Sequence, residues 1–171
     1  MYPITTARLR LIPGSSDVLD ADMALLLTGN DAALRFLLNT AAVGEWPPIG
    51  GEHDINALEF FRSQIVQFPF SEEWLAYYVC LGKELVGSAG FFGPPVDGEV
   101  EIGYSICSTH RRRGIASEAI EGLLNKARQF GALSARARTS PENVASTDLL
   151  LKAGFTEDVS DDTHRVFRRV L

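Results

Sequence analysis

Cysteine is scarce in this chain of 171 residues, which contains only Cys80 and Cys107. The two lie far apart in the sequence and neither belongs to a metal-type pair. The sequence therefore predicts neither a disulfide framework nor a zinc ribbon. We expect each thiol to fill a site facing a strand.

Long apolar runs are also missing. No window approaches the roughly 18 consecutive apolar residues that a membrane-spanning helix requires, so we expect no membrane span. The first residues, MYPITTARLRLIPG, lack the basic stretch and apolar core of a secretory signal. Together these absences predict a cytoplasmic protein with no membrane partner.

The chain has no surplus of positive charge. Its 16 Lys and Arg residues stand against 22 Asp and Glu residues, which gives a net charge of −6. Non-specific nucleic-acid binding depends on surplus positive charge, so we expect no nucleic-acid partner. The length and the 46% hydrophobic content are ordinary for a soluble globular protein and predict one domain over residues 1–171.

Hydrophobic periodicity predicts an α+β fold. Apolar residues at helical spacing predict helices over residues 15–29, 31–38, 55–67, 115–130 and 140–152. Alternating segments predict strands over residues 5–13, 74–81, 85–92, 99–106 and 133–139, with a final hairpin after residue 155. The short connections between residues 74 and 106 are typical of an antiparallel meander.

The stretch THRRRGIASEA, residues 109–119, joins a predicted strand to the clearest predicted helix. The first turn of a helix has unpaired N–H groups and a partial positive charge, so it accepts anions. Gly114 and Ala116 would let a ligand approach the backbone, and arginines suit phosphate. The segment is neither a Walker A loop nor G-x-G-x-x-G. These residues alone leave a phosphate cradle and a plain basic turn as equal alternatives.

A second segment, SPENVASTDLLLKAGF from residue 140 to 155, predicts a helix capped by Ser140 with Pro141 in its first position. Asn143 and Ser146 lie on nearly the same face of this helix. An ordinary amphipathic helix requires neither residue there. The alternative is that Asn143 supports the helix cap and that Ser146 is solvated.

Together these segments resemble the GNAT N-acetyltransferases, most closely the RimJ/RimL branch, which acetylates the N-terminal amines of ribosomal proteins. TTARLRLIP is similar to the opening T-x-R-L-x-L-R-x strand, EIGYSICSTHRRRGIASEA to the acetyl-CoA motif, and ENVASTDLLLKAGF to the N-x-x-S-x-x-x-L-x-K-x-G-F helix. Their shared order and spacing extend over nearly the whole chain. The resemblance implies a mixed, mostly antiparallel central sheet that is flanked by helices and splayed at the acetyl-CoA site.

The resemblance also implies which residues bind acetyl-CoA. Backbone amides from Arg111 to Ala116 would wrap the pyrophosphate, and Ile106 and Ser108 would offer main-chain groups to the pantetheine arm. Asn143 would contact the cofactor from the following helix, and no metal is implied. The implied acetyl-CoA-binding residues are Ile106, Ser108, Arg111, Arg112, Arg113, Gly114, Ile115, Ala116 and Asn143.

The implied reaction is direct attack of a neutral primary amine on the thioester. An α-amine, with a pKa of about 8, is more readily neutral than lysine, with a pKa of about 10.4. The Ile106 amide would stabilise the oxyanion. Many relatives protonate the thiolate with a tyrosine seven residues after the position of Asn143, where this chain has Leu150. We therefore assign the donor role to Ser146.

The base is assigned to Glu101, acting through water, with Glu99 as the alternate. Either carboxylate could instead be a solvated strand residue. His53 and Asp54 have no further metal-type neighbours in the sequence, so we expect His53 to be a loop residue near the acceptor pocket. Aromatic residues could shape that pocket or belong to the core; they are Trp46, Phe68, Phe70 and Trp74.

The sequence thus predicts an acetyl-CoA-dependent N-acetyltransferase, with a protein N-terminal α-amine as its first acceptor class. An acceptor that is a small-molecule amine, such as an amino acid, a polyamine or an antibiotic, is the first alternative. The second is a degenerate domain that senses CoA without turnover, and the third is RNA or nucleotide binding through the arginines. Dimers are frequent in this family, so the resemblance also allows a homodimer.

Overall fold

A single mixed sheet forms the centre of the protein. The computed structural model describes residues 3–49, 53–69 and 74–171. Within these ranges eight strands lie in the order β1-β2-β3-β4-β5-β6-β8-β7. The strands are β1 (Ile4–Thr5), β2 (Leu9–Pro13), β3 (Ala76–Leu81), β4 (Glu84–Phe91), β5 (Glu99–Ile106), β6 (Ser134–Thr139), β7 (Thr156–Glu157) and β8 (Arg165–Val170).

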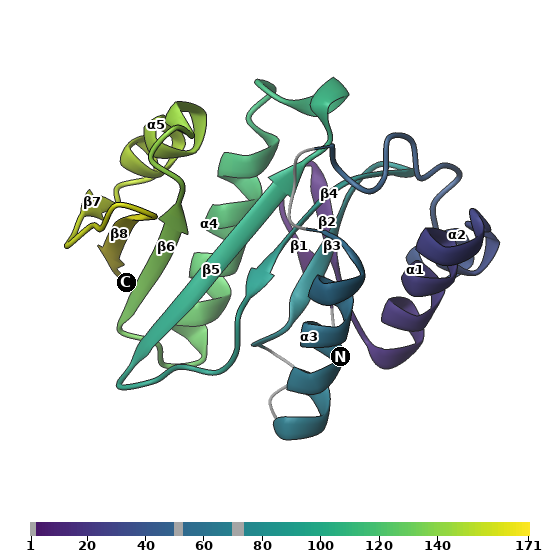
Figure 1. Cartoon of the computed structure of the whole chain (residues 1–171), viewed down its shortest axis with the longest axis horizontal. Helices are drawn as coiled ribbons and strands as arrows, with labels where there is room; N and C mark the ends of the chain where they lie inside the picture. Colours follow the sequence, from purple (N-terminus) through teal and green to yellow (C-terminus); the bar gives the residue numbers. More distant parts are fainter. Residues whose placement is uncertain (1–2, 50–52, 70–73) are drawn as a thin grey trace.

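The predicted splay is present between β5 and β6. These two strands pair in parallel, whereas the neighbouring strand pairs are antiparallel. Their pairing runs from Glu99 opposite Ser134 to Ile102 opposite Ala137, but β5 continues to Ile106. The two strands therefore part after Ile102 and Ala137, and Figure 1 shows them diverging. We call the space between their diverging ends the splay.

The helices cover the two faces of the sheet. The helices are α1 (Ser16–Thr28), α2 (Ala32–Leu38), α3 (Ile55–Gln67), α4 (Ile115–Gln129) and α5 (Val144–Lys152). In Figure 1, α4 lies behind the sheet and α3 in front of it, with α1 and α2 beside β3. None of the helices within the described ranges is long and apolar enough to cross a membrane.

The apolar face of α4 forms the main core. Ile120 and Leu123 are fully buried among residues of β4 and β5, such as Val86 and Ile102. A second buried cluster lies on the other face of the sheet, where α1, α2 and α3 pack against β3 and β4. The sheet is therefore buried on both faces near β3, which explains why every residue of β3 from Ala76 to Cys80 is buried.

Two predicted elements differ from the structure by more than two residues. The strand predicted over residues 5–13 is interrupted, because the Thr6 amide donates to the Leu9 carbonyl in a tight turn at 3.0 Å. The helix predicted from Ser140 begins at Val144, because the Asn143 side chain accepts from the Ser146 amide at 3.0 Å and so caps the helix. An asparagine that caps a helix satisfies an otherwise unpaired N–H, and here it overrides the Ser-Pro signal.

A buried carboxylate organises the α1 side of the sheet. Asp22 on α1 is 0% exposed and accepts three hydrogen bonds, from Trp46 Nε1 at 2.8 Å and from His53 Nε2 and the Tyr78 hydroxyl at 2.6 Å each. Burial and the Asp22 charge raise the pKa of Tyr78 well above its usual range, so the phenol remains a donor. These bonds connect α1, the loop that leads to α3, and β3.

The Asp22 network predicts a large effect on stability. Asp22→Ala would leave three buried donors without an acceptor and should lower the free energy of unfolding by about 3 kcal/mol. Asp20→Ala is the matched control on the same helix, because Asp20 forms an exposed ion pair with Arg62 at 3.0 Å. The control should cost less than about 1 kcal/mol. Urea unfolding of both variants checks this, and equal losses would contradict the structural role of Asp22.

Candidate active site

The segment between β5 and α4, residues 107–114, forms a tight turn, which we call the cofactor loop. It contains a short 3-10 turn over Ser108–His110 and two residues with positive φ, Arg112 at 57° and Gly114 at 74°. Because α4 begins directly after Gly114, the backbone turns sharply into the helix. Gly114 adopts this left-handed conformation without the steric penalty that a Cβ would add.

The start of α4 is open. Among the residues that the structure describes, no side chain caps this helix. The first intrahelical bond joins the Glu118 amide to the Gly114 carbonyl at 3.1 Å, so the amides of residues 115–117 have no acceptor within the helix. A Cβ on Gly114 would lie 3.4 Å from Arg8 Nη2. Amides and the positive end of the helix dipole thus face the same place, which is the arrangement that the predicted phosphate cradle requires, and phosphate binding there stays a prediction.

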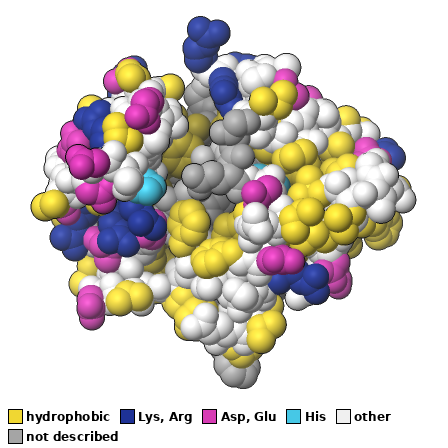
Figure 2. All heavy atoms as spheres, viewed as in Figure 1, with side chains coloured by type: hydrophobic (Ala, Val, Ile, Leu, Met, Phe, Trp, Pro, Cys, Tyr) yellow, Lys and Arg dark blue, Asp and Glu magenta, His cyan; other side chains and the backbone are white. Residues whose placement is uncertain are grey.

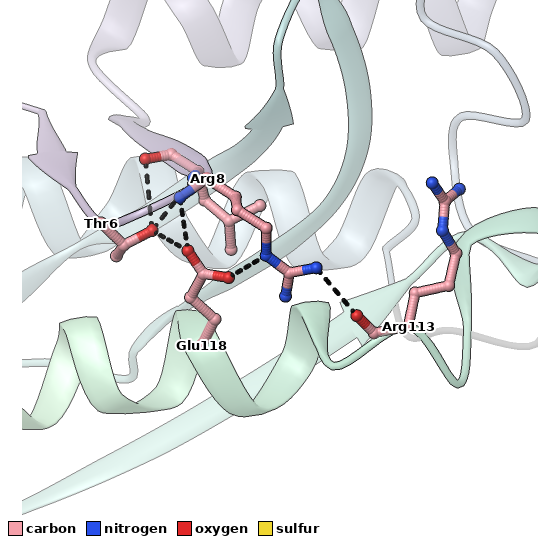
Figure 3. Close-up of polar contacts among 5 residues, drawn as sticks. Thr6, Arg8, Arg113 and Glu118 are labelled. Carbon is pink, nitrogen blue, oxygen red and sulfur yellow. Dashed lines mark hydrogen bonds and ion pairs between the residues drawn. The ribbon is translucent and has the colours of Figure 1, made fainter.

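The N-terminal motif supports this cradle, as Figure 3 shows. Glu118 in the first turn of α4 accepts from the Thr6 hydroxyl at 2.5 Å, from the Arg8 amide at 2.7 Å and from Arg8 Nε at 2.6 Å. Arg8 also donates to the Arg113 carbonyl at 3.1 Å. Burial favours the protonated form of Glu118, but the bonds from Thr6 and Arg8 outweigh it and lower the pKa. Two motifs distant in sequence thus form one unit, a contact that sequence reasoning missed.

The three arginines have different environments. Arg111 points back into the protein, where Nε donates to the Ile106 carbonyl at 2.8 Å and Nη2 to the Ile49 carbonyl at 3.0 Å. Its amide donates to the Ser108 carbonyl at 3.3 Å. All three arginines are exposed residues. Arg111 shapes the cofactor loop through its bonds to backbone carbonyls, whereas Arg112 and Arg113 immediately precede Gly114 in the chain.

The loop after α2 is fastened to the cofactor loop by Glu45. The Ser108 hydroxyl donates to both oxygens of Glu45, at 2.7 and 2.9 Å, and the Thr109 amide donates at 3.1 Å. The bonds from Ser108 and Thr109 lower the pKa of Glu45, so the carboxylate stays charged at neutral pH. The predicted contact residue Ser108 is thus held in place by a partner more than sixty residues away.

The amide of Ile106 faces the splay. The Cys107 amide donates to the Val86 carbonyl of β4 at 2.9 Å. Successive residues of a strand direct their peptide groups to opposite edges, so Ile106 directs its N–H away from β4, toward the side that β6 has left. Gly87 opposite Ile106 makes this close pairing possible, because a Cβ there would lie 2.4 Å from the Ser105 carbonyl oxygen. The Ile106 amide therefore points into the splay, and its role as oxyanion donor stays a prediction.

Ser146 on α5 is hydrogen bonded to a residue that the sequence did not single out. Its hydroxyl lies 2.7 Å from the hydroxyl of Tyr104 on β5. Leu150, one helical turn later, is 0% exposed and belongs to the main core. Asn143 caps the helix, as one of the two sequence interpretations expected, but Ser146 is not simply solvated. Nothing in the spacing of Tyr104 and Ser146, 42 residues apart, identifies this pair.

Glu101 lies on the opposite face of β5 from Tyr104. Its two carboxylate oxygens accept from Arg136 at 2.6 Å and from Arg138 at 2.7 Å, both on β6. Glu99 forms an ion pair with Arg168 on β8 at 2.5 Å. Figure 2 shows charged side chains of both signs gathered over this part of the sheet. Both candidate bases are therefore carboxylates held among arginines on the face that α3 partly covers.

The remaining candidates divide between core and loop. His53 is buried against Asp22 and is edge-on to Trp46, with ring centroids 4.3 Å apart. Trp46 and Trp74 are both only 7% exposed and belong to the two cores, as the core interpretation of the aromatic residues expected. Phe70 lies outside the described residues.

Comparison with known proteins gives consistent matches. Residues 23–156 match the family model described as an acetyltransferase (GNAT) domain. The chain is 32% identical over 116 residues to the uncharacterized N-acetyltransferase YjdG of Bacillus subtilis (strain 168). The aligned region covers 66% of this chain and 67% of YjdG.

Two solved structures share the fold over almost the whole chain. One is the RimL ribosomal L7/L12 α-N-protein acetyltransferase in complex with coenzyme A, with a TM-score of 0.68, 16% identity, and coverage of 99% of this chain and 98% of that chain. The other is a putative ribosomal-protein-serine acetyltransferase from Vibrio cholerae, with a TM-score of 0.67, 17% identity and the same coverage. With the family model spanning most of its length, the chain belongs to the GNAT acetyltransferases.

Proposed function

We propose that this acetyltransferase uses acetyl-CoA to acetylate a primary amine, and that the acceptor is the N-terminal α-amine of a protein. The observation that carries the proposal is the open start of α4, which adjoins the splay in the sheet. A phosphate group at that helix start and an extended arm in the splay would together account for both features. Coenzyme A has this combination of a pyrophosphate and an extended pantetheine arm.

Each part of the cofactor would meet a different group of this chain. The amides of residues 115–117 and the exposed side chains of Arg112 and Arg113 would hold the pyrophosphate. The peptide groups of β5 that face the splay would pair with the pantetheine arm, as an added strand does at an open edge. Asn143, whose Oδ1 is used in the helix cap, still has its amide NH₂ for a cofactor oxygen.

Once acetyl-CoA supplies the activated acyl group, the reaction requires from the protein an oxyanion donor, a general base and a proton donor for the sulfur. The Ile106 amide would donate to the carbonyl oxygen as negative charge develops there. Glu101 would accept the proton of the attacking amine through water. A hydroxyl beside the splay would meet the departing sulfur, and Ser146 is the first candidate.

The choice of a protein N-terminus rests on two supports. An α-amine is neutral in a larger fraction of molecules at neutral pH than a lysine side chain is, because its pKa is lower by about 2. The two structural neighbours with the same fold carry names that specify ribosomal proteins as acceptors. Small-molecule amines are the competing acceptor class.

Ligand binding and turnover test the proposal separately. Acetyl-CoA and CoA should each raise the melting temperature, because a ligand that binds only the folded state stabilises it. Thiol release from acetyl-CoA should then accelerate with peptides that begin with a free serine amine. Spermidine, free lysine and an aminoglycoside serve as small-amine comparisons. Faster release with a small amine would replace the acceptor class. Stabilisation without release from any amine would instead favour a CoA sensor.

The cofactor loop gives a sharper prediction. Gly114→Val should abolish acetyl-CoA binding, because a β-branched residue resists the positive φ and its side chain would enter the cradle. Arg112→Ala should only weaken binding, since the amides remain. Calorimetric titration with acetyl-CoA measures both.

The matched control is Gly131→Val at the other end of α4. Gly131 also has a positive φ, 84°, and a Cβ there would meet nothing within 4 Å. This variant should carry similar backbone strain but retain acetyl-CoA affinity. Greater damage from Arg112→Ala than from Gly114→Val would show that charge, and not the open helix start, dominates binding.

A further inference from the structure

A pair of hydroxyl groups bridges the two sides of the splay. Tyr104 lies two residues beyond the last β5–β6 pair, and Ser146 lies on α5, the helix that follows β6. Their oxygens are 2.7 Å apart. The Tyr104 side chain is half-buried and packs against the main core, on the same face of β5 as Ile102 and Ile106. The pair therefore joins β5 to α5 at the point where β5 has lost its contact with β6.

The rest of α5 explains why a tyrosine on β5 is needed. Leu150 and Ser146 are separated by one helical turn and share a face of α5. Leu150 is completely buried in the core, and its side chain has no group that can donate a proton. Ser146, at the start of the helix, is only half-buried. The phenol of Tyr104 reaches the same place from the opposite side.

The phenol is suited to hold a proton there. Burial raises the pKa of Tyr104, and the hydrogen bond to Ser146 lowers it less than burial raises it. Of the two hydroxyls, the phenol is the one that ionises within the ordinary range of side-chain pKa values. At neutral pH the pair therefore carries two hydroxyl protons. One serves the hydrogen bond between the two oxygens, and the other can be directed at a third atom.

We propose that Tyr104 and Ser146 act as one unit that donates a proton to the departing sulfur of coenzyme A. This inference rests on the proposed function and adds Tyr104 as a catalytic residue. It assigns to a β5 phenol and an α5 hydroxyl together the role that many relatives give to a single tyrosine at the position of Leu150.

The proton balance of this step closes. The amine nitrogen forms a bond to the acetyl carbon, and the bond between that carbon and sulfur breaks with its electron pair on sulfur. The hydroxyl nearer the sulfur first donates a hydrogen bond and then its proton, and the second hydroxyl replaces that proton through the 2.7 Å bond. The amine nitrogen loses its proton through water to Glu101, which releases it to solvent, and the pair regains one proton from solvent. The products are the acetylated amine and the CoA thiol.

The unit should be visible in the bound product without any acceptor. A hydrogen-bond donor beside the sulfur favours the thiolate, so CoA bound to the wild-type protein should have a thiol pKa below that of free CoA. In Tyr104→Phe and in Ser146→Ala the pKa of the bound thiol should be about 1 higher than in the wild type. Ultraviolet absorbance of the thiolate across a pH series measures it. Affinity for desulfo-CoA, which lacks the sulfur, should stay the same.

Turnover provides the second measurement, with acetyl-CoA and a serine peptide. Each single variant should lower kcat by about 100-fold while leaving the KM for acetyl-CoA within about threefold. The double variant should be little worse than either single variant, since two residues that act as a unit are not additive. Ser105→Ala is the matched control, because it removes a neighbouring β5 hydroxyl that faces the other side of the sheet. It should keep both the thiol pKa and kcat.

The outcomes separate the inference from the proposed function. A bound thiol pKa and a kcat that are both unchanged in Tyr104→Phe would overturn the role of Tyr104 and leave the acetyltransferase intact. A loss of kcat in Ser146→Ala alone would return the donor role to Ser146. A wild-type protein that binds no CoA and releases no thiol would overturn both the proposed function and this inference.

Discussion

The loss of pairing between β5 and β6 is the constraint on which the site depends. Peptide groups that have no partner and no water are costly, so a sheet that opens in its interior must offer those groups to something else. Beyond Ile102 the groups that β6 would have met belong to Tyr104 and Ile106. Arg111 occupies the Ile106 carbonyl, which leaves the neighbouring N–H for a ligand.

Charged side chains and backbone groups have separate roles in the proposed anion site at the cofactor loop. The residues that stand out in the sequence are the three arginines, yet Arg111 contributes by bonding to carbonyls of its own protein. Arg8, in the turn between β1 and β2, packs beside Gly114 and holds Glu118 at the helix start. A negative side chain in the first turn is favourable for the helix dipole. The open amides remain available because Glu118 is engaged by Thr6 and Arg8.

Hydrophobic periodicity and capping residues predict most of the helices and strands. They do not predict polar contacts between residues that are far apart in the sequence. The bounds of α3 are those that its apolar periodicity predicts, and α4 begins at Ile115 as predicted. The predicted start of α5 is wrong because Ser140 and Asn143, three residues apart, are both suitable capping residues. The Asn143 side chain is the one that caps the helix.

The unpredicted contacts join residues far apart in the chain. The Asp22 network and the Tyr104–Ser146 pair each connect residues that only the folded sheet brings together. By sequence pattern, Asp22 is a polar residue of an amphipathic helix and Tyr104 is a residue of a strand, and neither is distinguished from its neighbours. Single-sequence periodicity detects which face of an element is apolar, but it contains no information about which polar groups will meet across elements.

The loop between α2 and α3 connects the cofactor loop to the buried network around Asp22. At Trp46 and His53 it is bonded to Asp22, in the helical layer over β3. At Glu45 and Ile49 it is bonded to the cofactor loop. A displacement of the cofactor loop would therefore act on the Asp22 network through the adjacent residues Glu45 and Trp46. In thermodynamic terms such a coupling is reciprocal: the free energy by which a ligand at the cofactor loop stabilises the network equals the free energy by which loss of the network weakens binding.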